Sequence, residues 1–427
     1  MNRVTKIDWR TESGPRLGGF AYWYDALGRI VSRRHSLGGA SFDRAYSYDD
    51  MDRLATDGDA AYSYDAAGNR MTRTEDGETV TYSLGQGDRL ASWTGGSYQY
   101  DAAGCVTRIT RGADTWDLIW NGQYQLVSVS TNGAFAESYS YDALGRRVTT
   151  TNLAGTERHV YDDSWQVVAD LDEDGNVLRS YVWGEGIDRI LAVKIGSRTY
   201  TALTDVQGTV WGYADEQGDI VARWTYDAWG NALTEEVDAS AAELSAVRYR
   251  FQGRERSAAT GLANFRMRWY DAVTGRWLSK DPIGLSGGLN LFAFCGGDGH
   301  NNTDLIGCAH IATRPLDSGG GFMQPVNNAL SHLPGNIDPR HAEIFFDDND
   351  PDGPSHCGYG PSGPHQDNST VPYNNHGPNI YDDDIMRQAV NNVSNNPDWQ
   401  GDKYGFFSRN CQDFVSAVIE EYIRLKK

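Results

Sequence analysis

Short segments of alternating apolar and polar residues fill the first 248 residues, and turn-forming residues separate them. One such segment, residues 61–64, is followed directly by Asp65, two alanines and Gly68. Alternation with a period of two predicts a strand with one buried and one solvated face. Asp and Gly at the break predict a tight turn, because both tolerate the backbone conformations of a chain reversal. The pattern therefore predicts a succession of β-hairpins.

The predicted hairpins share a motif, Tyr-Asp-Ala-x-Gly. Copies begin at Tyr24, Tyr64, Tyr100, Tyr141 and Tyr226, with a looser copy at Tyr48. A single hairpin cannot bury one of its faces, whereas stacked hairpins bury a continuous apolar surface. We therefore expect residues 1–248 to be mainly β and to form a long, curled antiparallel sheet. A β-solenoid or a propeller is the alternative.

Composition and charge narrow the possible functions. The chain has 427 residues, enough for two or three domains, and its 48 Gly and 24 Tyr are typical of strands joined by tight turns. A net charge of -20 argues against a nucleic-acid partner. Five scattered cysteines match neither a disulfide framework nor a metal motif, but they allow a thiol nucleophile. We expect no metal and no cofactor.

Residues 249–308 form a second region with two echoing motifs. Residues 269–277 predict a strand, a turn and a strand, with Asp and Gly at the reversal. Further on, Asp281-Pro-Ile-Gly-Leu is echoed by Asp304-Leu-Ile-Gly-Cys. The two Asp residues are either plain turn-formers or a functional pair.

Residues 249–308 resemble the conserved end of the core in Rhs/YD-repeat proteins, at nearly every position of that family's pattern. The resemblance implies that the YD repeats wind into a β-cage, here a partial one, and that the core cuts itself after the closing motif. It assigns the carboxylate pair to Asp281 and Asp304, with Arg268 as a supporting charge. Two close carboxylates resist double ionisation, so one serves as acid and the other as base. The implied cut lies between Cys308 and Ala309.

The closing motif departs from the family pattern, because it lacks the family's Pro and its terminal Leu. Cys308 takes the place of that Leu. The acidic residue of the motif is retained, so we expect the cut to occur, although slowly.

The composition changes after residue 308. Eleven of the 13 Pro and six of the nine His lie in residues 309–427, and twelve of the 13 Trp precede them. A shift of this size marks a domain boundary. We therefore divide the chain into a YD-repeat shell (1–248), a core-terminal segment (249–308) and a C-terminal domain (309–427).

Two segments of the C-terminal domain carry candidate chemistry. Residues 341–346 predict a short strand that begins with His341, and residues 409–423 predict a helix with one apolar stripe. Asn410 is a suitable N-cap and places Cys411 in the first turn, where unpaired N–H groups favour the thiolate. The alternative is that Cys411 is a small buried apolar residue and His341 a surface residue.

The order His-x-Glu and then Asn-Cys-x-x-Phe-Val resembles permuted papain-like enzymes, namely the NlpC/P60 and lecithin:retinol acyltransferase-like groups. The resemblance implies that Cys411 is the nucleophile and His341 the base. His356 would orient the imidazole, with Glu343 as the rival, and Asn410 would help to form the oxyanion site. A peptide or amide bond, such as one in peptidoglycan, is the expected substrate, and a phospholipid acyl group is the alternative.

Two other chemistries are alternatives for this domain. His356, Cys357 and His365 could bind zinc, but their spacing matches no common zinc motif. A nuclease would need a basic surface, whereas this domain has 16 acidic and eight basic side chains.

Together these patterns predict an Rhs-type antibacterial toxin: a mainly β shell that releases a small α+β cysteine hydrolase. Family resemblance implies a cognate immunity protein and type VI secretion components as partners. It also implies synthesis in the cytoplasm, export without a signal peptide, and action in the target cell. A non-enzymatic repeat scaffold is the alternative of a different class.

Overall fold

The computed structural model describes residues 3–11, 16–162, 165–184 and 187–308. It also describes four short strands, β29 (Ile311–Ala312), β30 (Glu343–Phe345), β31 (His356–Gly360) and β32 (Gly363–Gln366). The chain divides into two compact units, Met1–Asp317 and Ser318–Lys427. Within the described part of the chain, the helices are too short to cross a membrane.

The first unit is built on a single antiparallel meander of 23 strands, in which each strand pairs with the next one along the chain. This confirms the expected curled antiparallel sheet and the mainly β class. The strands are β1 (Lys6–Arg10), β2 (Arg16–Tyr24), β3 (Ile30–Leu37), β4 (Ala40–Tyr48), β5 (Leu54–Asp57), β6 (Ala60–Tyr64), β7 (Arg70–Glu75), β8 (Glu78–Leu84), β9 (Leu90–Trp93), β10 (Gly96–Tyr100), β11 (Val106–Arg111), β12 (Asp114–Trp120), β13 (Leu126–Thr131), β14 (Ala134–Tyr141), β15 (Arg147–Asn152), β16 (Gly155–Tyr161), β17 (Val167–Leu171), β18 (Val177–Trp183), β19 (Ile190–Ile195), β20 (Arg198–Thr204), β21 (Val210–Ala214), β22 (Ile220–Tyr226) and β23 (Ala232–Val237).

The Asp-Gly turns share one hydrogen-bond arrangement. At Asp65, the side-chain oxygen accepts a 2.8 Å bond from the backbone N–H of Asn69, and the Asp65 N–H donates to the Asn69 carbonyl at 2.9 Å. Gly68 supplies the left-handed residue, with φ of 81°. The same pair of bonds closes the turns that start at Asp25, Asp49, Asp101, Asn121, Asp142, Asp162, Asp172, Asp205, Asp215 and Asp227.

The tyrosine of the motif joins each repeat to the preceding one. Tyr64 donates its hydroxyl hydrogen to the carbonyl of Leu54 at 2.7 Å, and Tyr141 does the same to Leu126 at 2.7 Å. Both acceptors are the first residue of the strand after the preceding turn. Each such bond satisfies a main-chain carbonyl near the edge of the sheet and fixes the spacing between repeats.

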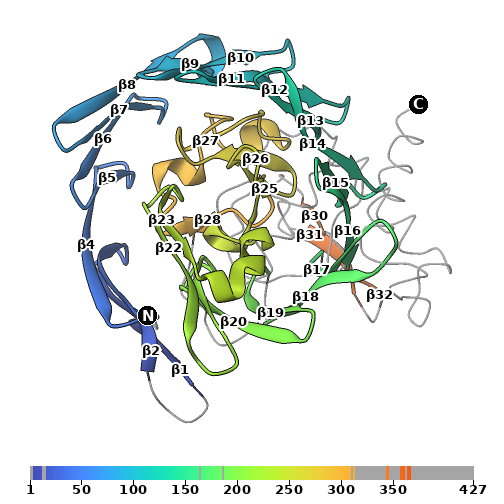
Figure 1. Cartoon of the computed structure of the whole chain (residues 1–427). Helices are drawn as coiled ribbons and strands as arrows, with labels where there is room; N and C mark the ends of the chain where they lie inside the picture. The colour runs from blue at the N-terminus through green and yellow to red at the C-terminus, as the bar shows by residue number, and fades with distance from the viewer. Residues whose placement is uncertain are drawn as a thin grey trace. The chain divides into compact units, whose positions relative to one another are not determined.

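The sheet curls on itself, and its last strands lie inside its first ones (Figure 1). Phe20 on β2 packs edge-on against Trp211 on β21 with ring centroids 5.2 Å apart, and Tyr62 on β6 packs against Trp229 at 5.8 Å. These contacts place one aromatic core between the two layers of the curl. Burial of this apolar surface is the main force that holds the curl closed.

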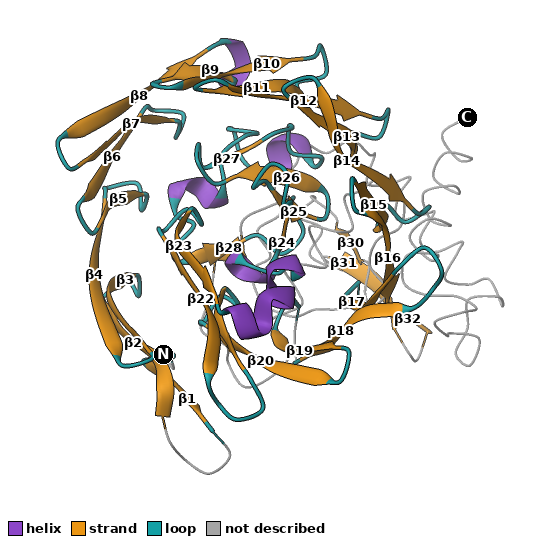
Figure 2. Ribbon diagram, in the orientation of Figure 1, coloured by secondary structure: helices purple, strands orange, loops and turns teal. Residues whose placement is uncertain are grey.

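Residues 239–308 fill the interior of the curl, where most of the short helices of the described chain gather together with a small sheet (Figure 2). Backbone pairing of Tyr270 with Trp277 confirms the strand, turn and strand expected over residues 269–277. The elements are η2 (Ala239–Ala246), η3 (Phe251–Gly253), β24 (Glu255–Arg256), β25 (Ala263–Phe265), β26 (Arg268–Asp271), β27 (Arg276–Trp277), η4 (Gly284–Gly287), η5 (Cys295–Gly297) and β28 (Asn302–Thr303); the remaining short helix, η1 (Gln86–Asp88), precedes β9.

The core-terminal segment is hydrogen-bonded to the sheet at widely separated points. The Leu278 carbonyl accepts a 2.8 Å bond from the backbone N–H of Val106, and the Asn301 side chain accepts one from Ile30, also at 2.8 Å. Asp271 accepts from Tyr98 and Arg111. The surrounding sheet therefore fixes the position of residues 249–308.

In the second unit the structure describes one antiparallel sheet, β30 to β32. Its register pairs Phe345 with His356 and Glu343 with Gly358. The expected helix at residues 409–423 lies outside the described residues.

Candidate self-cleavage site

Three of the side chains singled out in the sequence meet inside the curl. Arg268 begins β26, Asp281 follows β27, and Asp304 follows β28. Nη2 of Arg268 lies 3.0 Å from Oδ2 of Asp281 and 3.2 Å from Oδ2 of Asp304. Their exposed fractions are only 2%, 8% and 1%, respectively. One guanidinium therefore bridges two buried carboxyl groups.

Asp304 is held by the loop that follows it. Its Oδ1 accepts hydrogen bonds from the backbone N–H groups of Ile306 (3.3 Å), Gly307 (2.7 Å) and Cys308 (3.2 Å). Gly307 has φ of 75°, and a Cβ atom there would lie 2.6 Å from the carbonyl oxygen of Phe265. Only glycine fits this position, so the tight loop and the orientation of the carboxylate depend on one another.

Asp281 has fewer donors than Asp304. Its Oδ1 accepts one backbone hydrogen bond, from Ile283 at 3.0 Å. Burial raises the pKa of Asp281 to about 7; Arg268 opposes this rise, and the nearby Asp304 charge adds to it. Burial also raises the pKa of Asp304, against the Arg268 charge and the three backbone N–H groups. Asp281 is therefore partly protonated near neutral pH.

Arg268 is fixed by more than its two acidic partners. Its guanidinium lies over the ring of Trp277, 4.1 Å from the centroid, which adds a cation–π contact. Its Nε donates to the carbonyl of Gly307, and its Nη1 donates to that of Leu291 at 3.3 Å. The same side chain thus binds both carboxylates and the residue that precedes Cys308.

The carbonyl oxygen of Cys308 and the carboxyl group of Asp281 both border the space beside Gly287. A Cβ atom placed on Gly287 would be 2.5 Å from Oδ2 of Asp281 and 3.2 Å from the Cys308 carbonyl oxygen, so both atoms border one small space. The Cys308 thiol is completely buried, and burial raises its pKa well above the usual range. The thiol is therefore a poor nucleophile. Ala309 lies outside the described residues.

A buried acid–base pair next to a peptide carbonyl is suited to amide hydrolysis. The carboxylate of lower pKa can take a proton from water, while the protonated partner can donate one to the carbonyl oxygen or to the leaving nitrogen. Arg268 limits the charge repulsion between the two acids.

The second set of candidate residues is only partly described. His341, Asn410 and Cys411 lie outside the described residues. Glu343 is on β30 and His356 on the adjacent β31, two positions apart in the register.

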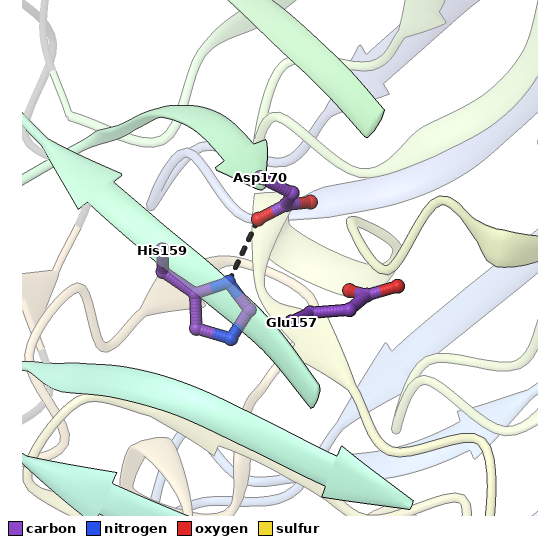
Figure 3. A group of neighbouring side chains, drawn as sticks. All are labelled: Glu157, His159 and Asp170. Carbon is purple, nitrogen blue, oxygen red and sulfur yellow. Dashed lines mark hydrogen bonds and ion pairs between the residues drawn. The ribbon is translucent and has the colours of Figure 1, made fainter. Parts of the chain in front are cut away.

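A further polar cluster, which the sequence motifs do not reveal, joins the sheet to the core-terminal segment. Glu157, His159 and Asp170 lie together on β16 and β17 (Figure 3), with Nδ1 of His159 2.7 Å from Oδ1 of Asp170. Ligand atoms this close could hold a metal ion. However, Arg248 lies 2.9 Å from Asp170 and 3.0 Å from Glu157, so a guanidinium already provides the positive charge.

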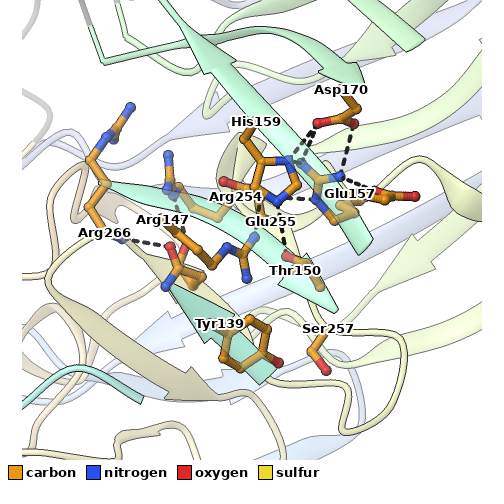
Figure 4. A network of polar contacts seen from close by, with 12 residues as sticks. Tyr139, Arg147, Thr150, Glu157, His159, Asp170, Arg254, Glu255, Ser257 and Arg266 are labelled. Atoms are coloured by element: carbon orange, nitrogen blue, oxygen red, sulfur yellow. Dashed lines mark hydrogen bonds and ion pairs between the residues drawn. The ribbon is translucent and has the colours of Figure 1, made fainter. Parts of the chain in front are cut away.

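The network extends to a second buried acid, Glu255, which Figure 4 labels together with Glu157, His159 and Asp170. Nε of Arg248 lies 3.0 Å from Glu255, which also pairs with Arg147 on β15. Burial would raise the pKa of Glu255, but these two arginines hold it well below the usual range. The same balance of burial against Arg248 and His159 keeps the pKa of Asp170 low. The network therefore anchors the start of the core-terminal segment to strands β15, β16 and β17 of the surrounding sheet.

The curled sheet, its Tyr-Asp turns and the filled interior define a YD-shell protein. Residues 17–286 match the Teneurin YD-shell family, so the chain belongs to that family. This confirms the resemblance to YD-repeat proteins over most of the first 308 residues.

Relatives and solved structures agree with this assignment. The tRNA nuclease WapA of Bacillus subtilis strain 168 is 30% identical over 236 residues, which cover 54% of this chain and 10% of WapA. Double-stranded DNA deaminase toxin A of Burkholderia cenocepacia strain H111 is 28% identical over 315 residues, which cover 64% of this chain and 21% of that toxin. The crystal structure of TcdB2-TccC3-Cdc42 has the same fold, with a TM-score of 0.60 at 20% identity over 72% of this chain and 18% of that one.

This chain thus covers about a tenth of the length of WapA and about a fifth of the length of the deaminase toxin. Both relatives are named for nucleic-acid substrates, which is in tension with the expectation that this chain has no nucleic-acid partner.

Proposed function

We propose that residues 1–308 are the shell of a toxin that cuts its own chain after Cys308, and that residues 309–427 are the effector it releases. The arrangement of Asp281 and Asp304 around Arg268, beside the Cys308 carbonyl, is the observation that carries this proposal. The deaminase toxin among the relatives supports a toxin role for the whole protein.

In the proposed reaction, Asp304 acts as base and Asp281 as acid. Asp304 removes a proton from a water molecule, whose oxygen attacks the carbonyl carbon of Cys308, while Asp281 donates a hydrogen bond to the carbonyl oxygen. The C–N bond to Ala309 then breaks as its nitrogen takes up the proton that Asp304 removed from the water, which returns both acids to their starting states. The products are a carboxyl group on Cys308 and a free amine on Ala309.

The cut is tested on a denaturing gel with the full chain, Asp281→Asn and Asp304→Asn. The wild type is expected to give two fragments, and the mass of the smaller one should correspond to residues 309–427. Both variants should remain a single chain, because Asn is nearly the same shape but can neither give nor take the proton. Unchanged cleavage of Asp281→Asn would reject the carboxylate mechanism.

We also propose that the released effector is a cysteine hydrolase that acts on a peptide or amide bond, for example in peptidoglycan. Cys411 would be the nucleophile and His341 the base, with His356 or Glu343 orienting the imidazole and Asn410 contributing to the oxyanion site. Support comes from the motifs and their order in the sequence. A phospholipid acyl group is the second candidate substrate, because relatives of the permuted papain-like group act on acyl chains.

A nucleic-acid-directed effector is a competing class, since two relatives of the shell are named for such substrates. The excess of acidic side chains in residues 309–427 opposes it. Export through a type VI system and a protective immunity protein complete the proposal.

The effector is tested by expressing the full chain and Cys411→Ala in bacteria, in the cytoplasm and with a periplasmic signal. Loss of toxicity in the variant supports the thiol mechanism, and full toxicity of the variant rejects it. Peptidoglycan digests, lipid extracts and tRNA integrity then distinguish the three substrate classes. No toxicity of the wild type in either compartment would favour the scaffold alternative.

A further inference from the structure

Gly287, the last residue of η4, is packed against the proposed self-cleavage site. A Cβ atom on Gly287 would lie 2.5 Å from Oδ2 and 3.0 Å from Cγ of Asp281, and 3.2 Å from the carbonyl oxygen of Cys308. Favourable contacts between non-bonded carbon atoms begin at about 3.5 Å. A methyl group at this position would therefore overlap the Asp281 carboxyl group.

The backbone of Gly287 does not itself require glycine. Gly284 and Gly288, on either side, have φ of 59° and 129°, values that favour glycine, whereas Gly287 is not among the residues with positive φ. At Gly284 and Gly288 an added Cβ would meet no atom within 4 Å. Conformation thus explains the two neighbouring glycines, and the close approach of Asp281 explains Gly287.

We infer that Gly287 is a positioning residue for self-cleavage: its missing side chain lets the Asp281 carboxyl group lie against the backbone next to the Cys308 carbonyl. This inference rests on the proposed self-cleavage. It adds a requirement beyond the two carboxyl groups, because Gly287 has no reactive group and acts only by leaving room for Asp281.

A side chain at residue 287 would change the position of Oδ2 of Asp281. This oxygen bonds to Arg268 at 3.0 Å, while Oδ1 bonds to the Ile283 N–H at 3.0 Å. A methyl group would push Oδ2 away from Gly287 and therefore change its distances to Arg268 and to the Cys308 carbonyl. Displacements near 1 Å in a catalytic site cost on the order of 100-fold in rate.

The test compares Gly287→Ala with Gly288→Ala in the full chain. The first variant adds the overlap with Asp281 without backbone strain, and the second adds backbone strain without the overlap. Each chain is diluted from urea, and the fraction cut is followed over time on a gel. We expect Gly287→Ala to be slower by about 100-fold and Gly288→Ala to stay within a few-fold of the wild type.

A second readout separates positioning from loss of stability. The groups that face Asp281 are Arg268, Asp304 and the Cys308 thiol. Movement of the carboxyl group away from Arg268 would shift the pH dependence of cleavage to higher pH, whereas a merely less stable fold would leave it unchanged. Circular dichroism shows whether each variant is folded.

The outcomes are distinct. Wild-type speed in Gly287→Ala, or equal slowing in both variants with an unchanged pH profile, would overturn the inference while leaving the proposed self-cleavage intact. Slow cleavage confined to Gly287→Ala, with a shifted profile, supports it. If the wild type is not cut, or if Asp281→Asn is cut as fast, the proposed function fails and this inference fails with it.

Discussion

Nη2 of Arg268 lies 3.0 Å from Oδ2 of Asp281 in the interior of the YD shell. Because the same nitrogen also reaches Asp304, one positive charge is shared by two buried acids. Full ionisation of both would leave an uncompensated negative charge inside the protein, which is costly. A single proton held on the pair removes that charge, and the same proton is what a carboxylate-based cleavage needs.

Replacement of Arg268 by lysine should slow the cut at least tenfold. Lysine keeps the charge but loses the planar guanidinium that reaches both acids while it lies over Trp277. Cleavage after dilution from urea measures the effect. Arg146→Lys is the matched control, because Arg146 also combines an ion pair, with Asp142 at a sheet turn, and a cation–π contact, with Tyr161, but contacts neither of the two acids, and it should be cut like the wild type. Equal rates for the two variants would argue against the bridging role of Arg268.

Cleavage should slow as the pH rises above 7. Asp281 is the proposed proton donor, and burial raises its pKa to about 7, so its protonated form predominates below that value and is lost above it. We expect roughly a tenfold fall in rate for each pH unit above the pKa. Rates are measured between pH 5.5 and 9 after dilution from urea, with circular dichroism at each pH as a check on folding. A rate that rises steadily with pH would point to a thiolate or hydroxide mechanism instead.

The Cys308 thiol should be dispensable for the cut. The thiol is buried and its pKa is raised well above the usual range, so almost none of it is thiolate at neutral pH. What the site uses of this residue is its N–H, bonded to Asp304, and its carbonyl. Cys308→Ala should therefore still give two fragments on a gel, whereas Asp304→Asn should not. Complete loss of cleavage in Cys308→Ala, in a folded protein, would favour a thiol nucleophile.

The repeated turns show how far the sequence could predict the fold. The search for Tyr-Asp-Ala-x-Gly finds the turns at Asp25, Asp65 and similar sites, but it misses those at Asn121, Asp162, Asp172, Asp205 and Asp215, which close with the same bonds. Four of the missed turns lack the tyrosine, and the turn at Asp162 has it but lacks the Ala and the Gly. The turn depends on the Asp or Asn side chain, and the tyrosine forms the contact between repeats. A search for Asp-x-x-Gly alone would have found three of the five missed turns.

The residues of the candidate self-cleavage site could be predicted from the sequence only where they belong to a recognisable motif. Asp281 and Asp304 stand out in the sequence because their short motifs echo each other. Gly287 does not, because its role depends on a close approach that only the folded loop creates. The pairing of Arg248 with Asp170, 78 residues apart, was also missed, because it arises from the curl that brings β17 against the end of the shell region, directly before the core-terminal segment.

Arg248 provides the last prediction, which concerns stability. It bonds to Glu157, Asp170 and Glu255, all within 3.0 Å. Replacement by methionine keeps most of the side-chain volume but leaves buried carboxylates without this partner, which typically costs about 3 to 5 kcal/mol. Urea unfolding of Arg248→Met, in the Asp281→Asn background so that all chains are intact, measures the loss.

Arg34→Met is the matched control for Arg248→Met, because Arg34 and its partner Asp43 are more than half exposed. An exposed pair contributes at most about 1 kcal/mol, so this variant should unfold close to its parent. The same experiment tests the metal alternative at Glu157, His159 and Asp170. With Arg248 present, added Zn²⁺ should leave the unfolding midpoint unchanged, since the guanidinium holds the same oxygens. A clear stabilisation by Zn²⁺, or equal losses in the two variants, would show that Arg248 is not the cation on which this cluster depends.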